Sequence, residues 1–295
     1  MKLDKVVSKS MLRSIAIGIG IFWATDLIKQ QAQAHGYRKF KDGQYESAIF
    51  EYKKALLFDL GRGAFDPKRV STIYTNLCAS KLKIGDLNGA LPECNKAIKL
   101  DPTLSTNFLN RCSANDLLGN HKGAITDCEK AVELKTVNPA AFVGLCRLKN
   151  IIGDNKSALK DCNLAVTMFP SNKLVYHNRC FVNSDLDDFT SAIKDCHKSL
   201  AVNPELKSAY YPLCRSYVLL ENTNESLKYC NKAVENIKSF SEGSVAIPAT
   251  YYFSGFANFY NLRIKQGCDN FKQALALGIP DTDGSVNSLR KKYCT

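Results

Sequence analysis

A short phrase recurs along this chain with a constant period of about 34 residues, and this period limits the fold more than any other feature. A second phrase, which contains one aromatic residue, precedes each copy at the same interval. Both phrases have helical spacing, so the sequence predicts an array of two-helix repeats. The five clearest copies read GALPECNKAIKLDP (89–102), GAITDCEKAVEL (123–134), SALKDCNLAVTMFP (157–170), SAIKDCHKSLAVNP (191–204) and SLKYCNKAV (226–234).

Residues that end one helix and start the next separate the two phrases of every repeat. A glycine or an acidic residue comes first, and an aspartate or asparagine follows; these types favour helix ends and helix starts, respectively. Each repeat is thus predicted to be a first helix, a tight turn and a second helix. The turn pairs are Gly85-Asp86, Gly119-Asn120, Gly153-Asp154, Asp187-Asp188 and Glu221-Asn222.

Small residues seven positions apart mark the second helices, for example Ala90 with Ala97 and Ala158 with Ala165. Small side chains let paired helices approach to the short end of the range of about 8–10 Å between axes. With the aromatic residue and the small residue four positions later in each first helix, this pattern resembles the tetratricopeptide repeat (TPR) family. The resemblance implies an all-α fold, a right-handed superhelical solenoid whose concave wall is lined by the first helices.

The resemblance covers about residues 29 to 281, because a degenerate repeat flanks the five clear ones at each end. Weak terminal repeats are typical of such arrays, since end repeats must present one face to water. The resulting array of about seven repeats occupies residues 35–281 of the mature chain, and a capping segment with a short helix follows over 282–295. The predicted repeats lie near residues 29–62, 71–104, 105–138, 139–172, 173–206, 207–240 and 248–281.

Residues 1–34 have the features of an export signal. Basic residues precede an apolar run over 14–23, and Ala32-Gln33-Ala34 matches an A-x-A cleavage site, so the mature chain is expected to begin at His35. The alternative is an uncleaved membrane anchor, although the apolar run is short for a membrane span. The predicted location is the periplasm or the extracellular space, or the membrane if the leader stays attached. Cleavage would remove half of the first helix in the first repeat.

Ten of the twelve cysteines occupy two fixed positions in the five clear repeats, one in each helix. Both positions lie about seven residues, or about 10 Å, from the turn, so the two cysteines of a repeat are level on antiparallel helices. A disulfide needs Cα atoms roughly 4.4–6.8 Å apart, which the neighbouring small residues allow. Disulfides persist in oxidising compartments, in agreement with the export signal.

Cysteines of adjacent repeats also lie level with each other, so pairing within repeats and pairing between repeats are both possible. The number of cysteines that each scheme leaves without a partner decides between them. Pairing within repeats satisfies all ten, whereas pairing between repeats leaves Cys78 and Cys230 without partners. The terminal repeats hold a small and an aromatic residue at these positions, Gly36 with Tyr52 and Gly255 with Phe271. The predicted bonds are Cys78–Cys94, Cys112–Cys128, Cys146–Cys162, Cys180–Cys196 and Cys214–Cys230, with Cys268–Cys294 fastening a C-terminal helix over Val286 to Tyr293.

The alternatives for the cysteines are weaker. Free cysteines can pack as small apolar residues, but this leaves a gap where the second helix otherwise has an aromatic residue. Metal binding and redox catalysis are disfavoured because no C-x-x-C cluster occurs and the four histidines follow no repeat. The predicted hairpins are reminiscent of secreted cysteine-rich Sel1-like repeat proteins, although the cysteine spacing differs.

No motif predicts an enzyme, a metal site or a cofactor. The S-x-x-K matches lack the K-T-G and S-D-N partners of penicillin-recognising enzymes. Asp127, Asp161 and Asp195 are too far apart for joint acid–base work, and we expect them to form a solvated face. The formal charge is +12, but no interleaving of basic and aromatic residues indicates nucleic-acid recognition.

Two sets of first-helix residues are candidates for binding a partner. In peptide-binding TPR proteins, an asparagine of the first helix often contacts the ligand backbone. The resemblance implies the same role for asparagines at three matching positions of this chain. The alternative is that they are simply polar residues on a solvent-exposed face. Towards the C-terminus the inward positions become aromatic, which predicts an apolar groove for a peptide or, alternatively, the surface on which the C-terminal helix docks. The candidates are Asn76, Asn110 and Asn178, and Tyr211, Tyr252, Phe256, Phe259 and Tyr260.

The sequence therefore favours a protein-interaction scaffold or adaptor that binds a peptide or protein on the concave face. The alternative is a structural protein of the cell envelope whose disulfides serve stability and which has no dedicated ligand. Arg111 and Arg179 alternate with Arg147 and Arg215 beside the cysteines of the first helices. They provide either a cationic stripe for an acidic partner or solubility alone.

Overall fold

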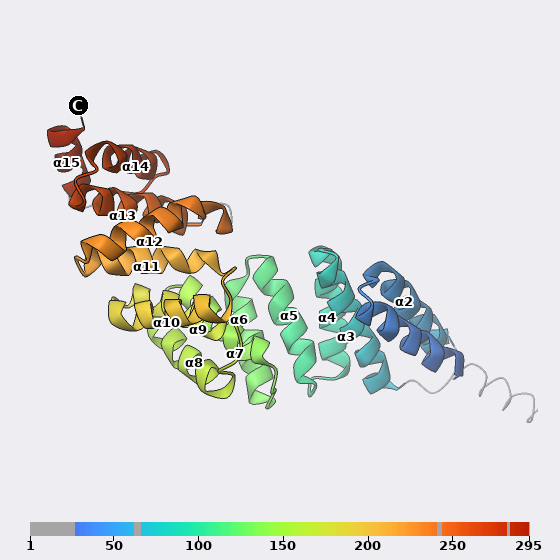
Figure 1. The fold of residues 1–295 in the computed structure, drawn as a ribbon. Helices are drawn as coiled ribbons and strands as arrows, with labels where there is room; N and C mark the ends of the chain where they lie inside the picture. Colours follow the sequence, from blue (N-terminus) through green and yellow to red (C-terminus); the bar gives the residue numbers. More distant parts are fainter. Residues whose placement is uncertain (1–26, 62–65, 241–243, 282–283, 295) are drawn as a thin grey trace, which may run out of the picture. The chain divides into compact units, whose positions relative to one another are not determined.

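The computed structural model describes residues 27–61, 66–240, 244–281 and 284–294. These residues are all-α and form the predicted TPR-like solenoid of helical hairpins (Figure 1). The chain divides into two compact parts, Met1–Val137 (the N-terminal part) and Asn138–Thr295 (the C-terminal part).

The N-terminal part contains three hairpins. A helix over residues 27–41 pairs with α2, α3 with α4, and α5 with α6. Tyr52 of α2 and Ile73 and Leu77 of α3 are at most 1% exposed and share one apolar cluster. The helices of this part are α2 (Tyr45–Gly61), α3 (Pro67–Lys83), α4 (Leu87–Leu100), α5 (Ser105–Leu117) and α6 (His121–Glu133).

The C-terminal part contains four hairpins and a final helix. Figure 1 shows α11, α12 and α13 stacked in chain order, and α15 beside α14. Two 3₁₀ turns, η1 (Lys207–Ala209) and η2 (Ile237–Ser239), flank the hairpin of α11 and α12. The helices are α7 (Pro139–Ile151), α8 (Asn155–Met168), α9 (Val175–Asp185), α10 (Phe189–Val202), α11 (Tyr210–Leu219), α12 (Thr223–Glu235), α13 (Ala246–Tyr260), α14 (Ile264–Ala276) and α15 (Ser285–Tyr293).

The turns of the five clear repeats form as the sequence predicts. The first residue of each turn pair, glycine or acidic, adopts a left-handed conformation with φ between +56° and +83°. The aspartate or asparagine that follows is the N-cap of the second helix and accepts a hydrogen bond from a backbone N–H at 2.9–3.2 Å. This bond satisfies one of the free donors at the helix start.

The twelve cysteines form six disulfides, five within hairpins and one between α14 and the residue after α15. Their Cα atoms lie 4.5–5.6 Å apart, which is within the range that a disulfide requires. The pairs are those that counting selects from the sequence. Each of the five hairpin bonds lies in the interior, since its two cysteines are at most 5% exposed.

The predicted leader lies mostly outside the described residues, because the description begins at residue 27. The helix over 27–41 contains the proposed cleavage site and buries Lys29 and Ala32, which are 4% and 3% exposed. Ala32 belongs to the same apolar cluster as Tyr52. Within the described residues, no helix is both long and apolar enough to cross a membrane.

The prediction of a solvated acidic face was wrong for Asp127 and Asp195, which are only 2% and 3% exposed. The guanidinium of Arg179 binds both oxygens of Asp195, at 2.7 and 2.8 Å, and Arg111 binds Asp127 in the same way at 2.9 and 2.6 Å. The hydrogen bond to Asp195 raises the pKa of Arg179. These two arginines are therefore internal partners and supply no cationic stripe.

The hairpins α3–α4 and α7–α8 use a different pair at the corresponding place. Leucine replaces the arginine, and a lysine one turn later binds the acidic residue of the second helix. Lys81 binds Glu93 and Lys149 binds Asp161, each at 2.8 Å. The two arrangements alternate over the four hairpins from α3 to α10. In the next hairpin, stacked Tyr217 and Tyr229 hold the positions of the lysine and the acidic residue.

Candidate functional site

An aromatic row follows the first helices of the C-terminal part. Five of its members hold two inward positions, four residues apart, that repeat on α9, α11 and α13; the second position on α11 is Arg215, and Phe253 and Tyr260 of α13 complete the row. Consecutive ring centroids are 5.0 to 6.5 Å apart, within the range of favourable aromatic pairs. In order, the row consists of His177, Phe181, Tyr211, Phe253, Tyr252, Phe256 and Tyr260.

Tyr211 contacts three other aromatic rings. Phe240, which follows η2, meets its ring edge-on at 6.1 Å, and Phe181 and Phe253 lie on α9 and α13. Burial raises the pKa of the Tyr211 hydroxyl to about 12. The ring is thus fixed in position by neighbours from three elements.

A hollow of about 180 Å³ opens beside the start of the row, between α7 and α9. Its lining combines the apolar Ile151 and Phe181 with Arg147, Asn178 and His177. Burial lowers the pKa of His177 to about 4, so the imidazole is neutral at physiological pH. Its Nε2 lies 3.3 Å from the Ser208 hydroxyl, whereas its buried Nδ1 has no hydrogen-bond partner among the described residues.

Two of the three predicted asparagines also hold the first helices together. The side-chain amide of Asn110 donates to the Thr75 carbonyl at 3.1 Å, and that of Asn178 donates to the Val143 carbonyl at 3.2 Å. Asn76 instead borders a hollow of about 510 Å³ in the N-terminal part, together with Tyr37.

The predicted C-terminal aromatic residues divide into two groups. Phe259 is 9% exposed and packs against Phe271 and against Tyr293 of α15, so it belongs to the core rather than to an open groove. Tyr260 is 49% exposed, and Tyr252 and Phe256 are half-buried. The C-terminal helix therefore covers one edge of the predicted aromatic surface and leaves the other accessible.

An apolar hollow of about 550 Å³ lies between this surface and α15. Phe256 and Tyr260 border it from α13, and Leu289 and Tyr293 border it from α15. Within the described residues, no group of three or more His, Cys, Asp or Glu side chains is placed to hold a metal ion.

Three aromatic residues of this region, His177, Phe181 and Phe240, were not predicted from the sequence. The signal for His177 was present, because it precedes Tyr211 by one full repeat and so holds the same inward position. Phe181 precedes Arg215 by the same interval. Phe240 follows the second helix, where the repeat gives no positional rule.

No protein-family model matches the chain. A segment of 73 residues is 36% identical to the mitochondrial import receptor subunit TOM34 of Rattus norvegicus and 33% identical to that of Homo sapiens. The matched segment is 25% of this chain and 24% of either relative, so only about a quarter of these proteins is compared.

Solved structures match over more of the chain. A tetratricopeptide repeat protein from Parabacteroides merdae superposes with a TM-score of 0.59 and 15% identity, over 91% of this chain and 100% of that one. Pseudomonas aeruginosa PilF gives 0.60 and 13%, over 76% and 96%. YrrB, described as a TPR protein with an unusual peptide-binding site, gives 0.50 and 20%, over 61% and 91%. By its hairpins and these likenesses, the chain is a TPR-like helical repeat protein.

Proposed function

We propose that this protein is an interaction scaffold that binds an extended peptide or protein segment along the first helices of its C-terminal part. The observation that carries the proposal is the aromatic row, whose rings lie 5.0 to 6.5 Å apart along three successive first helices. Rigid aromatic side chains provide large contact area at a low cost in side-chain entropy. The peptide-binding site of the structurally similar YrrB supports the same use of this fold.

Polar groups beside the row supply direction and specificity for the bound segment. Arg147 lines the hollow between α7 and α9, as does His177, whose Nδ1 has no partner within the described ranges. A peptide backbone offers both donors and acceptors, so it can satisfy a buried imidazole nitrogen in either tautomer. We therefore place a polar backbone contact at His177 and apolar side-chain contacts further along the row.

We also propose that the scaffold works in an oxidising compartment, the periplasm or the extracellular space, either free or held by its N-terminal segment. The support is the set of six disulfides together with the predicted leader. Disulfides are rare in reducing compartments. Digestion of native material without reduction, followed by mass spectrometry, tests both the cross-links and the N-terminus.

Selection of short random peptides on the oxidised protein tests the binding face. An enriched peptide should bind roughly tenfold or more weakly to the variants Phe181→Ala and Tyr260→Ala, as expected when one aromatic anchor worth about 1.4 kcal/mol is lost. Phe50→Ala is the matched control, because Phe50 is 66% exposed on the second helix of the first hairpin. Equal binding to all three variants would exclude this face, and failure to enrich any peptide would favour a structural role for the protein.

A further inference from the structure

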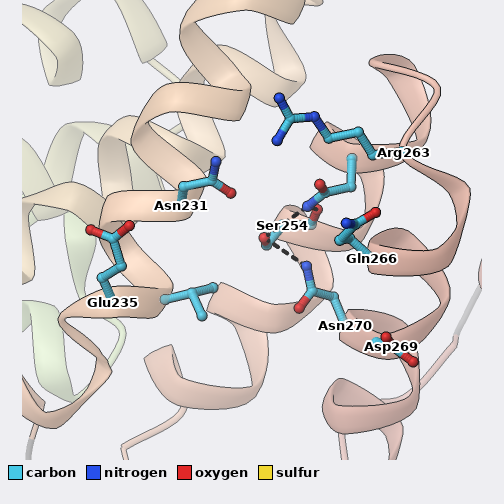
Figure 2. Close-up of a pocket in the computed structure, with 9 residues that line it drawn as sticks. Asn231, Glu235, Ser254, Arg263, Gln266, Asp269 and Asn270 are labelled. Atoms are coloured by element: carbon cyan, nitrogen blue, oxygen red, sulfur yellow. Dashed lines mark hydrogen bonds between the residues drawn. The ribbon is translucent and has the colours of Figure 1, made fainter.

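Two hollows of nearly equal size lie between successive second helices of the C-terminal part. One, of about 270 Å³, is lined by residues of α8, α9 and α10; the other, of about 260 Å³, is lined by residues of α12, α13 and α14 (Figure 2). Their walls are built from equivalent positions of the repeat. The equivalent pairs that matter here are Asn163 and Asn231, Arg179 and Ser254, Asn183 and Asn258, and Asp195 and Asn270.

The first hollow holds a guanidinium group, that of Arg179. Besides its two bonds to Asp195, the Arg179 side chain donates through Nη1 to Oδ1 of Asn163, at 2.9 Å. The amide of Asn183 supports the acceptor by donating to Oδ2 of Asp195 at 3.0 Å. The N-terminal part repeats this arrangement around Arg111.

The second hollow has a serine where the repeat pattern places an arginine. The inner position of the first helix alternates between leucine and arginine along the chain, and Ser254 is its last member. This alternation predicts arginine at position 254, because the preceding repeat has leucine at the equivalent position. In chain order the position reads Leu77, Arg111, Leu145, Arg179, Leu213 and Ser254.

Amide side chains surround Ser254 at the positions that Asn163, Asn183 and Asp195 hold around Arg179. Nδ2 of Asn270 donates to Oγ of Ser254 at 2.9 Å, and Nδ2 of Asn258 donates to the Ser254 carbonyl at 2.8 Å. With these N–H groups directed at Ser254, the amide oxygens are the acceptors that the two side chains retain. Figure 2 shows Asn231 on the opposite wall, facing Ser254 from α12.

The charges suit a cation that enters from outside. Glu235 and Asp269 border the hollow and are exposed. Arg263 also borders it, but no hydrogen bond or ion pair joins its side chain to the described residues, so it does not fill the place of Arg179. Asn270 replaces the buried aspartate, and a neutral amide avoids the cost of an unpaired buried carboxylate while the hollow is empty.

We propose that this hollow binds the guanidinium group of an arginine side chain presented by a partner protein. The guanidinium would take the place that Arg179 occupies in the sister hollow, with the amides as acceptors and with Glu235 and Asp269 supplying the opposite charge. The site lies on the face of α13 opposite to Tyr252 and Phe256. It is therefore separate from the proposed peptide-binding row and does not depend on it.

Titration with N-acetylarginine amide, followed by NMR, tests the proposal. Signals of α13 and α14 should shift and saturate, whereas N-acetylcitrulline amide, which has the same shape without the charge, should bind at least tenfold more weakly. Peptides with an internal arginine should bind at least as well as free arginine. Tighter binding of free arginine would instead assign the site to a small molecule and overturn the assignment to a partner protein.

Variants of the two hollows provide matched controls. Ser254→Arg combined with Asn270→Asp rebuilds the internal ion pair and should abolish binding, while Arg179→Ser opens the sister hollow and should add a second site. If the double variant does not fold, Glu235→Gln with Asp269→Asn should weaken binding several-fold, because both residues are exposed. No saturable shift at millimolar arginine amide, or full binding by these Ser254 and Glu235 variants, would overturn the proposal.

Discussion

Gly255 on α13 and Phe271 on α14 are in such close contact that a Cβ atom on Gly255 would lie 2.3 Å from Cε1 of Phe271. Gly36 and Tyr52 repeat this contact in the first hairpin, where the Cβ would lie 2.7 Å from the ring. The five hairpins between them have a disulfide at the same two positions. The interior thus accepts either a bond between two cysteines or a ring against a glycine.

This relationship predicts that one kind of pair can replace the other. The double variant Cys180→Gly with Cys196→Phe should be more stable under reducing conditions than the reduced wild type, because the ring fills the space that two thiols leave. In oxidising conditions the wild type should be the more stable, by up to about 3 kcal/mol for a loop of this length. Thermal unfolding with and without a reductant measures both differences.

The reversed variant, Cys180→Phe with Cys196→Gly, is the control for volume and composition. It should unfold at a lower temperature than either the wild type or the first double variant. Its aromatic ring would be attached to the first helix, at the position where the terminal hairpins have glycine. Equal stability of the two double variants would contradict the proposed complementarity.

Most of the fold could be predicted because each hairpin repeats its chemistry at fixed positions. The left-handed turn at Gly85, the cap at Asp86 and the cysteine pairs all depend on contacts within one repeat, and the period of the sequence displays them directly. The burial of Asp127 and Asp195 could not be read in that way. Both bind an arginine, whereas Glu93 and Asp161 at the equivalent positions bind a lysine, so the polar interior does not repeat from one hairpin to the next.

The candidate site was predicted less completely than the fold. Tyr252 and Tyr211 were predicted because they hold equivalent inward positions in successive repeats. His177 holds the same position in the repeat before Tyr211, so comparing the repeats one step further towards the N-terminus would have identified it. The burial of Phe259 depends on where α15 docks. That contact joins segments that the repeat does not relate, so periodicity gives no information about it.

The alternation of buried pairs leads to a second prediction. Arg179→Leu should lower the free energy of unfolding by about 3 kcal/mol or more, because it leaves the buried Asp195 without its ion pair. Adding Asn183→Lys should restore much of the loss, since leucine and lysine at these positions reproduce the arrangement of Leu145 and Lys149 around Asp161. Urea unfolding of the two variants measures the rescue, and a double variant no more stable than Arg179→Leu would show that the two arrangements are not interchangeable.

The turns of the later repeats predict a stabilising substitution. Glu221 has φ of +56°, a conformation that costs a residue with a Cβ roughly 1 kcal/mol and costs glycine little. Glu221→Gly should therefore raise the free energy of unfolding by several tenths of a kcal/mol to about 1 kcal/mol. Asp187→Gly is the informative comparison, because Asp187 has a similar φ but also binds Arg215 at 2.8 Å. A lower melting temperature for Glu221→Gly would contradict the strain argument.

Protonation of His177 should weaken the fold in acid. Burial lowers the pKa of this imidazole from an ordinary 6.5 to about 4 in the folded protein. Between these values the unfolded chain binds the additional proton, so the free energy of unfolding is full above about pH 6.5 and falls by up to about 3 kcal/mol as the pH drops towards 4. His177→Tyr, the residue found at the equivalent positions 211 and 252, should lose this part of the pH dependence. Urea unfolding of both proteins at about pH 7.5 and about pH 4.5 isolates the effect, because the carboxylates and the other histidines titrate alike in the two chains. The same fall in both proteins would show that the folded and unfolded chains protonate His177 alike, which would contradict the lowered pKa.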